Sequence, residues 1–539
     1  MSTSSGPAPV LIIGAGPTGL TCAALLARHG IRSLVVERHP DVYPLPRAVH
    51  LDDEALRILQ HVGVADGFTA ISRPARGMRL VDERMRTIAE FRRDRLVSEH
   101  GWPQANLFDQ PDLERLLRAG LARHPQAELL TEAEAEHIDP GDRTRPARVR
   151  IRHLADGRTE TVTAQVVLGC DGANSLVRRA IGATMRDLRF TEQWLVVDVR
   201  CARQLDVWDG VDQICDPRRA ATFMRIGPER YRWEFRIRPG ETAEELTSPQ
   251  ALARLLAPWT GNVPAEEVHV IRSASYTFKA RVADRWRAGR LFLLGDAAHL
   301  TPPFIGQGMC AGLRDAANLA WKLAVAGADP VRHERFLDTY ESERRPHVTH
   351  MIRLAVATGW AMTGGQDRAA ALRRLFLSQA VRLPALKSAM LRSVSPRLRP
   401  GPLVNGPMLR GPRLAGALMP QPRLTIDGTE HRFDDLLGHG FAIITRTPAP
   451  PALIRLAATL NAALVHTGGA GTDIRFPDGR RLTGHEDVLA SWLHRAGAHV
   501  AVIRPDRTVL TTLPPTGPAG PSTPSWLDLI PAFPGKTTP

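Results

Sequence analysis

The stretch Arg290–Lys322, RLFLLGDAAHLTPPFIGQGMCAGLRDAANLAWK, decides how this chain folds. Its first part, Leu291–Leu294, is a short apolar run that predicts a buried strand ending at Gly295-Asp296. After the loop around Gly306-Gln307-Gly308, apolar residues recur at three- and four-residue spacing. This spacing predicts a helix with one buried face, formed by Leu313, Ala316, Ala317, Ala320 and Leu323. Strand, loop and helix in this order are typical of an α/β protein.

The loop before this helix has the composition of a binding surface for a flat, anionic group. Pro302 and Pro303 stiffen the backbone, whereas Gly306 and Gly308 let it approach a ligand without a Cβ in the way. The helix start that follows aims free N–H groups and a partial positive charge at the same place. Asp296, at a strand end, is placed to hold a hydroxyl. Together these features predict a seat for a reduced flavin.

The N-terminal segment predicts a second half of the same ligand site. The apolar strand Val10–Ile13 runs into Gly14-Ala15-Gly16-Pro17-Thr18-Gly19 and then an apolar helix, and the next strand, Ser33–Val36, ends in Glu37. A glycine motif alone is weak evidence, but a strand, a helix and an acid at this distance complete the dinucleotide fingerprint. We expect the glycines to admit a pyrophosphate and Glu37 to bind ribose hydroxyls, because a ligand-free turn would not explain the acid.

Other segments add candidate contacts. Arg47 follows a proline and is a plausible phosphate or flavin contact, and Gln110 opens the helical part of Asn106–Leu117 and could reach a cofactor. Asp171-Gly172 marks another strand that ends in Asp-Gly and enters a helix. His50 has no evident partner and is interpreted as structural.

The middle of the chain changes to strand periodicity. Between Arg186 and Ile271 the residues alternate, and one strand carries Tyr231, Trp233 and Phe235 on one side with charged residues on the other. This aromatic face could roof a substrate pocket. For any single residue an ordinary place in the core is the favoured alternative.

These patterns predict several domains. Residues 1–76, 100–185 and 285–395 would form a discontinuous dinucleotide-binding domain. Within it Ala369–Val394 is basic and amphipathic, and packing on the domain is favoured over a membrane-surface role. Residues 77–99 and 186–284 would form a β-sheet substrate-binding domain. A linker (396–422), a thioredoxin-like α/β domain without cysteines (423–514) and a flexible tail (515–539) would follow.

Composition argues against several classes of function. A net charge of +14 suggests nucleic acid binding, but only four of the 70 basic residues are lysines, and the arginines are spread among 56 acidic residues. The five cysteines show no metal-ligand spacing, so we expect no metal site and free thiols in a reducing compartment. With no signal peptide and no apolar run of about 18 residues, the sequence predicts a cytoplasmic protein without nucleic acid or membrane partners.

Three of these segments together, GAGPTG, CDGANSLVR and LLGDAAHLTPPFIGQGM, resemble the group A flavoprotein monooxygenases, the aromatic hydroxylases with the p-hydroxybenzoate hydroxylase fold. PLPRAVHLDDEALRILQ, NLFDQPDLERLL and YRWEFRIRPGE look like the branch containing 3-(3-hydroxyphenyl)propionate hydroxylase and the polyketide hydroxylases of antibiotic biosynthesis. The resemblance implies a Rossmann-like FAD-binding domain, an inserted β-sheet substrate domain and a C-terminal thioredoxin-like α/β domain.

The resemblance also assigns roles to single positions. Contacts of FAD would come from Gly14, Gly16, Gly19, Glu37, Arg38, Arg47, Gln110, Asp171, Gly172 and Asp296, with Asp171-Gly172 also serving NAD(P)H. The isoalloxazine would be lined by Pro303, Gly306, Gly308 and Met309. His299 would be a packing residue, and no catalytic base can be assigned.

The implied activity is hydroxylation of an activated aromatic, most simply a phenol. NADH or NADPH would reduce FAD, O₂ would add at the flavin C4a carbon to give a hydroperoxide, and its distal oxygen would pass to the substrate. Baeyer–Villiger oxidation or epoxidation of a polyketide or terpenoid stays open as an alternative. A plain dehydrogenase leaves the Gly306–Met309 segment unexplained, and a noncatalytic FAD-binding or nucleic-acid-binding module predicts no substrate-stimulated NAD(P)H oxidation. The expected partner is a small aromatic molecule, and the expected assembly is a monomer or homodimer.

Overall fold

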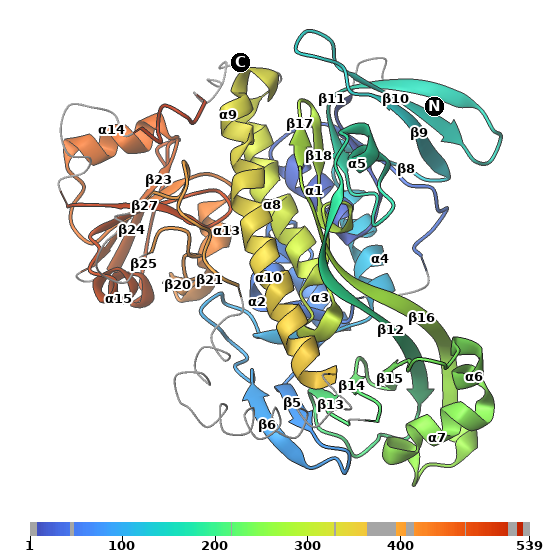
Figure 1. Cartoon of the computed structure of the whole chain (residues 1–539). Coiled ribbons are helices and arrows are strands. Elements are labelled where there is room, and N and C mark those ends of the chain that lie inside the picture. The colour runs from blue at the N-terminus through green and yellow to red at the C-terminus, as the bar shows by residue number, and fades with distance from the viewer. Residues whose placement is uncertain are drawn as a thin grey trace.

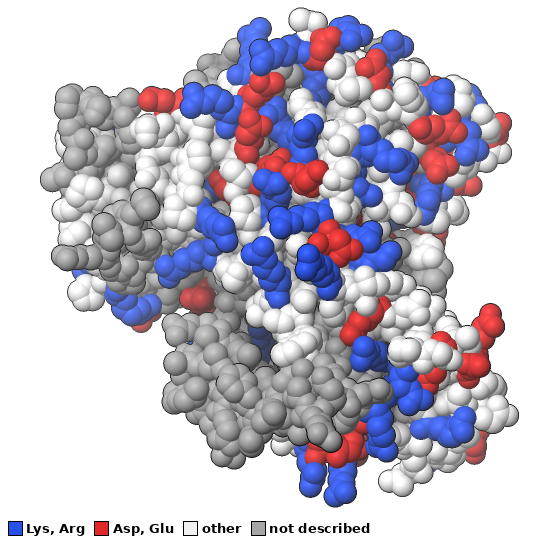
Figure 2. Space-filling view, viewed as in Figure 1, with Lys and Arg blue, Asp and Glu red and all other residues white. Residues whose placement is uncertain are grey.

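The computed structural model describes residues 8–43, 48–216, 218–327, 330–363, 395–405, 414–468, 471–515 and 525–531. Figure 1 shows two sheets that are linked by long strands, with helices between the first sheet and a separate C-terminal α/β unit. On the face in Figure 2, Lys and Arg side chains are interspersed with Asp and Glu over most of the visible surface. Within the described part of the chain no helix is long and apolar enough to cross a membrane.

The first sheet has a core of adjacent parallel strands in the order β18 (Leu291–Leu293), β11 (Thr159–Gly169), β1 (Ala8–Ile13), β2 (Ser33–Val36) and β8 (Ala127–Leu130). Three antiparallel strands extend it, namely β17 (Arg287–Ala288), β10 (Ala147–His153) and β9 (Ala133–Asp139). Because parallel strands end at one edge, the residues that follow β1, β2, β11 and β18 all lie on the same side of the sheet.

The second sheet is mostly antiparallel and draws on two separate parts of the sequence. Its order is β19 (His299–Leu300), β16 (Val268–Ala283), β12 (Met185–Cys201), β15 (Arg230–Arg236), β14 (Ala221–Arg225), β13 (Val211–Ile214), β5 (Gly77–Val81) and β6 (Thr87–Arg92). The short helices α6 (Ala243–Thr247) and α7 (Pro249–Thr260) lie at its far end (Figure 1). The strands β12 and β16 are long enough to run from this sheet toward the first one.

Helices pack on the first sheet because their apolar faces need burial. The helix α8 (Gly308–Ala326) is buried along almost its whole length, as is α1 (Pro17–Arg28), and α10 (Thr339–Thr363) runs beside α8 (Figure 1). The remaining helices of this part are α2 (Asp53–His61), α3 (Ala65–Ile71), α4 (Gln110–Leu121), α5 (Leu176–Ala180) and α9 (Glu334–Leu337). The predicted helix Ala369–Val394 lies outside the described residues.

The segment Asn106–Leu117 is only partly helical, and its helical part opens at Gln110 as expected. Asn106 and Leu107 belong to β7 (Ala105–Leu107), which pairs with β3 (His50–Asp52) and β4 (Arg73–Pro74) in a small third sheet. The helix begins at Gln110 with a proline in its first turn. The Asn106 side chain donates hydrogen bonds to the carbonyls of Leu51 and Pro103, which favours the extended conformation over the helix.

The C-terminal unit has a six-stranded sheet in the order β25 (Arg481–Gly484), β24 (Gly471–Arg475), β23 (Ala463–Gly468), β22 (Ala442–Thr445), β26 (Val500–Ile503) and β27 (Val509–Leu513). A hairpin of β20 (Arg423–Ile426) and β21 (Thr429–Arg432) precedes it, and the helices are α13 (Phe433–Leu437), α14 (Pro451–Thr459) and α15 (Val488–Arg495). This is the thioredoxin-like α/β unit that the sequence predicts, and all five cysteines lie before it.

Buried ion pairs join this unit to the main body. The Asp434 cluster consists of Asp434 with Arg57, His61 and Arg507, and the Asp434 carboxylate is fully buried. Its oxygens lie 2.6 Å from Arg57 Nε, 2.8 Å from His61 Nε2 and 3.2 Å from Arg507 Nε. Burial opposes ionisation, but the two guanidinium groups hold the pKa of Asp434 well below its usual range. The cluster therefore keeps a charged carboxylate at the boundary.

Histidines at the same boundary predict acid sensitivity. Burial, together with neighbouring cations, lowers the pKa of His29 to about 4 and that of His439 to about 3. Both are therefore neutral when folded but gain a proton in the unfolded chain below about pH 6.5. Below about pH 6.5 the unfolded chain binds more protons than the folded protein, so the free energy of unfolding decreases as the pH is lowered. At pH 5 the decrease is about 2 kcal/mol per histidine. His100 acts in the opposite direction, because its bond to Asp53 outweighs burial and raises its pKa.

Denaturant unfolding at pH 7.5 and pH 5 checks this. We expect the double variant His29→Gln/His439→Gln to lose much of the difference between the two pH values, whereas His137→Gln, at an exposed position, should keep it. An unchanged pH dependence in the double variant would contradict the assignment.

Candidate functional site

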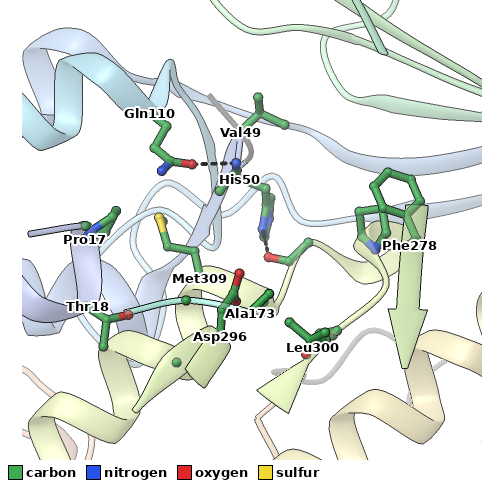
Figure 3. A pocket seen from close by; sticks show the side chains of 18 of the residues that line it. Pro17, Thr18, Val49, His50, Gln110, Ala173, Phe278, Asp296, Leu300 and Met309 are labelled. Carbon is green, nitrogen blue, oxygen red and sulfur yellow. Dashed lines mark hydrogen bonds between the residues drawn. The ribbon is translucent and has the colours of Figure 1, made fainter. Parts of the chain in front are cut away.

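A single cavity of about 1820 Å³ connects the two large sheets. Small-molecule pockets commonly measure about 300–1,000 Å³, so this space exceeds the need of one small ligand. It is lined by the strand ends after β1, β2, β11 and β18, by the start of α8, and by one face of the second sheet. Figure 3 shows side chains from these separate parts of the chain around one space, among them Thr18, Asp296, Met309 and Phe278.

The first strand end forms an open cradle at the start of α1. Gly14 has φ +102°, and a Cβ there would lie 2.4 Å from the Cys170 carbonyl oxygen. At Gly16 no protein atom lies within 4 Å of a Cβ position, and α1 has no side-chain cap. Glu37 accepts hydrogen bonds from the N–H groups of Ala15 and His39, which fix its carboxylate beside the cradle. Free helix N–H groups and open space suit a pyrophosphate.

Gly19 was expected to contact the ligand but lies behind the loop that lines the cavity. It is not among the residues that line the cavity. A Cβ at Gly19 would come within 2.0 Å of the Gly14 carbonyl oxygen, so this glycine permits close packing of α1 on the loop instead.

Asp171 lines the cavity, and hydrogen bonds from the chain hold one of its carboxylate oxygens. Its Oδ2 accepts the N–H groups of Leu176 and Val177, whereas the buried Oδ1 has no hydrogen-bond partner within the described residues. Burial raises the pKa of Asp171, although hydrogen bonds from the start of α5 oppose this. The next residue, Gly172, has φ +73° and open space at its Cβ position.

The segment Arg290–Lys322 supplies the wall of the cavity beside α8. Asp296, Pro303, Gly306, Gly308 and Met309 all line the cavity. Gly306 has φ +64°, a left-handed conformation that favours glycine. The helix α8 begins at Gly308 without a side-chain cap, so its first N–H groups and positive dipole end face the cavity.

The other predicted contacts differ in their placement. Gln110 lines the cavity, and its Oε1 accepts the Ala48 N–H at 2.7 Å, which ties α4 to the chain before β3 (Figure 3). Arg38 also lines the cavity, next to Glu37. Arg47 lies outside the described residues.

The aromatic face that was expected to roof a pocket requires a correction. Tyr231, Trp233 and Phe235 are buried in the core on the outer side of the second sheet and do not line the cavity. Residues of a strand alternate between faces, so Arg232 and Glu234 face the cavity instead. Arg232 Nε and Nη2 lie 2.7 and 2.9 Å from the Asp198 carboxylate. Burial raises the pKa of Glu234 against the opposing effect of Arg232.

His50 was missed by the sequence interpretation. It lines the cavity at the start of β3, and its Nδ1 lies 3.3 Å from the Gly306 carbonyl oxygen (Figure 3). Its partner is 256 residues away in the sequence, and no motif marks the pair. His299, by contrast, is a fully buried packing residue whose Nε2 lies 2.8 Å from Asp315.

The open cradle at Gly16 and the two uncapped helix starts that face the cavity fit FAD. Comparison with known proteins decides the family. The FAD binding domain model matches residues 7–355, more than half of the chain. The chain belongs to the FAD binding domain family. The HcaD C-terminal domain model matches residues 416–519 of this flavoprotein.

Individual relatives agree with the family. The flavoprotein is 36% identical over 515 residues to "3-(3-hydroxy-phenyl)propionate/3-hydroxycinnamic acid hydroxylase" of Burkholderia cenocepacia (strain HI2424), covering 93% of each chain. It is 32% identical over 501 residues to "Probable NADH-specific resorcinol 4-hydroxylase" of Rhodococcus jostii (strain RHA1), covering 92% of this chain and 90% of the relative. The solved ternary complex of aklavinone-11 hydroxylase with FAD and aklavinone has the same fold, with a TM-score of 0.75, 24% identity and coverage of 96% and 97%. The chain is therefore a flavin-dependent monooxygenase that uses FAD.

Proposed function

We propose that this flavoprotein consumes NADH or NADPH and O₂ to hydroxylate a phenolic substrate. The observation that carries the proposal is one continuous cavity that joins the dinucleotide cradle to the inner face of the second sheet. When bound, FAD supplies the redox chemistry that takes hydride from the nicotinamide and activates O₂. The inner face of the sheet, with Val196, Met224, Arg232 and Phe278, then holds the aromatic substrate against the flavin.

The residues of the chain bind the cofactor, orient it toward the substrate and exclude water. The cradle at Gly16 and the start of α1 hold the pyrophosphate, and Glu37 holds ribose hydroxyls. Asp296 holds the ribityl chain, and the dipole of α8 favours the anionic ring of the reduced cofactor. The apolar side chains of the sheet face keep water from the reacting atoms, which prevents wasteful release of hydrogen peroxide.

We expect Asp296→Ala to purify largely without yellow colour. Loss of a charged hydrogen-bond acceptor costs about 1.5–3 kcal/mol, which weakens FAD binding by about 10- to 150-fold. The ratio of flavin to protein absorbance measures occupancy, and titration with FAD measures affinity. Asp478→Ala, an exposed carboxylate in the C-terminal unit, is the control and should keep full occupancy. Full occupancy in Asp296→Ala would refute its assigned role.

The activity is tested by NADH and NADPH oxidation with a panel that includes hydroxyphenylpropionates, resorcinol, simple phenols and aromatic polyketides. Stimulation together with a product heavier by one oxygen supports hydroxylation. Mass spectrometry and NMR of the product separate ring hydroxylation from Baeyer–Villiger oxidation or epoxidation. Absence of any stimulated oxidation across the panel would refute the proposal.

We also propose the domain organisation predicted from the sequence, because residues 77–92 share a sheet with strands from 185–283. The cytoplasm remains the proposed location, since no disulfide joins the five cysteines. A monomer or homodimer remains the proposed assembly.

A further inference from the structure

His50 occupies the junction between the proposed flavin and substrate parts of the cavity. Figure 3 shows its ring beside the backbone that precedes α8, in the space bounded by Met309, Leu300 and Phe278. A Cβ on Gly306 would lie 2.8 Å from His50 Nδ1, so the ring packs directly on this glycine. From this position the His50 side chain can contact an aromatic substrate bound beside the flavin.

The hydrogen bond of His50 fixes which nitrogen can react. Its Nδ1 faces the Gly306 carbonyl oxygen at 3.3 Å, and a carbonyl only accepts, so Nδ1 carries the hydrogen. In the neutral ring Nε2 therefore keeps a lone pair, and within the described residues it has no hydrogen-bond partner. Burial lowers the pKa of His50, and the charge of Arg93 lowers it further, so the ring is neutral and its Nε2 lone pair is free of a proton.

Arg93 places a positive charge beside this acceptor. It follows β6, lines the cavity, and forms no ion pair with any carboxylate of the described chain. Asp52 and Asp53, its acidic neighbours, are bonded to Arg314 and His100 respectively. A cavity-facing guanidinium without a carboxylate stabilises an anion that is brought next to it.

We propose that His50 accepts the proton of the substrate ring hydroxyl and that Arg93 stabilises the phenolate that results. This inference rests on the proposed function and names the residues that activate the substrate. The O–H bond breaks with its electron pair left on oxygen, the N–H bond forms at Nε2, and no oxidation or reduction occurs in this step. The phenolate has more electron density on its ring carbons than the phenol, which favours attack on an electrophilic oxygen.

Other titratable groups of the cavity fit this role less well. Glu234 is buried and makes no hydrogen bond within the described residues, and its raised pKa favours the protonated acid, a donor. His350 lines the cavity from α10 but is exposed. Glu234→Gln is therefore a useful comparison variant, because it removes the rival carboxylate while keeping its shape.

The test compares two ligands of the holoenzyme. We take the phenol that stimulates NAD(P)H oxidation most in the panel and its methyl ether, which has no proton to give. Binding of each to the oxidised enzyme is measured from the change in flavin absorbance. The variants are His50→Asn, whose amide can still donate to Gly306, and Arg93→Met, with Arg93→Lys and Glu234→Gln as controls. The flavin content of each variant is checked first.

We expect the wild type to bind the phenol about tenfold or more tightly than the ether. His50→Asn and Arg93→Met should bring this ratio close to one by weakening phenol binding alone, whereas Glu234→Gln should preserve it and Arg93→Lys should preserve part of it. A wild type that does not prefer the phenol overturns the inference without any variant. An undiminished ratio in His50→Asn, or a ratio lost in Glu234→Gln, also overturns it. If the proposed function itself is wrong, no phenol stimulates NAD(P)H oxidation in the panel experiment, so this failure is distinguished from failure of the inference about His50 and Arg93.

Discussion

Replacement of Gly14 by alanine is expected to give a destabilised protein that retains almost no FAD. The added methyl would lie 2.4 Å from the Cys170 carbonyl oxygen and 2.8 Å from its carbonyl carbon, both backbone atoms of the neighbouring strand end. The φ of +102° is also unfavourable for any residue with a Cβ. Overpacking costs about 1–3 kcal/mol and a left-handed conformation about 1–2 kcal/mol more. The strands β1 and β11 would have to separate where both meet the ligand.

Gly16→Ala is the matched control for this prediction. Its φ of −72° is ordinary, and no protein atom lies within 4 Å of the new methyl, which would project into the cavity. We expect Gly16→Ala to unfold at nearly the wild-type temperature but to bind FAD more weakly. Thermal unfolding and flavin content measured on both variants separate the two effects. Wild-type stability in Gly14→Ala would contradict the close packing of the two strand ends.

Asp434→Ala is expected to lower the free energy of unfolding by about 3–5 kcal/mol, because it leaves buried cations without their carboxylate. The arginines Arg57 and Arg507 are both almost fully buried around it. Burial and the Arg57 charge both lower the pKa of Arg507, and Asp434 opposes them. Denaturant unfolding, followed by circular dichroism and by flavin fluorescence, measures the loss and shows whether the C-terminal unit separates before the flavin is released.

Asp435→Ala provides the comparison on the same helix. Asp435 is exposed and accepts a hydrogen bond from Gln60, so we expect its removal to cost less than about 1 kcal/mol. Equal losses in the two variants would show that the Asp434 cluster contributes nothing beyond an ordinary surface contact.

The meeting of distant strand ends at one cavity could be predicted from the sequence because the residues concerned directly follow strands. Gly14, Asp171 and Asp296 each come directly after an apolar run, and parallel strands bring such positions to one edge of a sheet. To predict each position it was enough to recognise the apolar run before it and to know that parallel strands end at the same edge of a sheet. The structure brings all three to the same cavity.

The substrate half could not be predicted in this way. Alternation along β15 separates Tyr231 and Trp233 from Arg232 and Glu234 but does not tell which set faces the core. Apolar character favoured the aromatic set for a pocket, whereas the α6–α7 end of the sheet covers that set. His50 could not be recognised either, because its partner carbonyl depends on the left-handed turn at Gly306.

The long strands β12 and β16 have a practical meaning for protein engineering. Met185, where β12 begins, pairs with Ala283, where β16 ends, so the segment between them begins and ends at the same position of one ladder. A segment bounded by these two residues can be exchanged for its counterpart from a relative through one junction in space, and the β5–β6 hairpin, which pairs with β13, needs a second junction. Chimeras built in this way would test whether the second sheet carries substrate choice, because the strand ends of the first sheet stay those of the recipient.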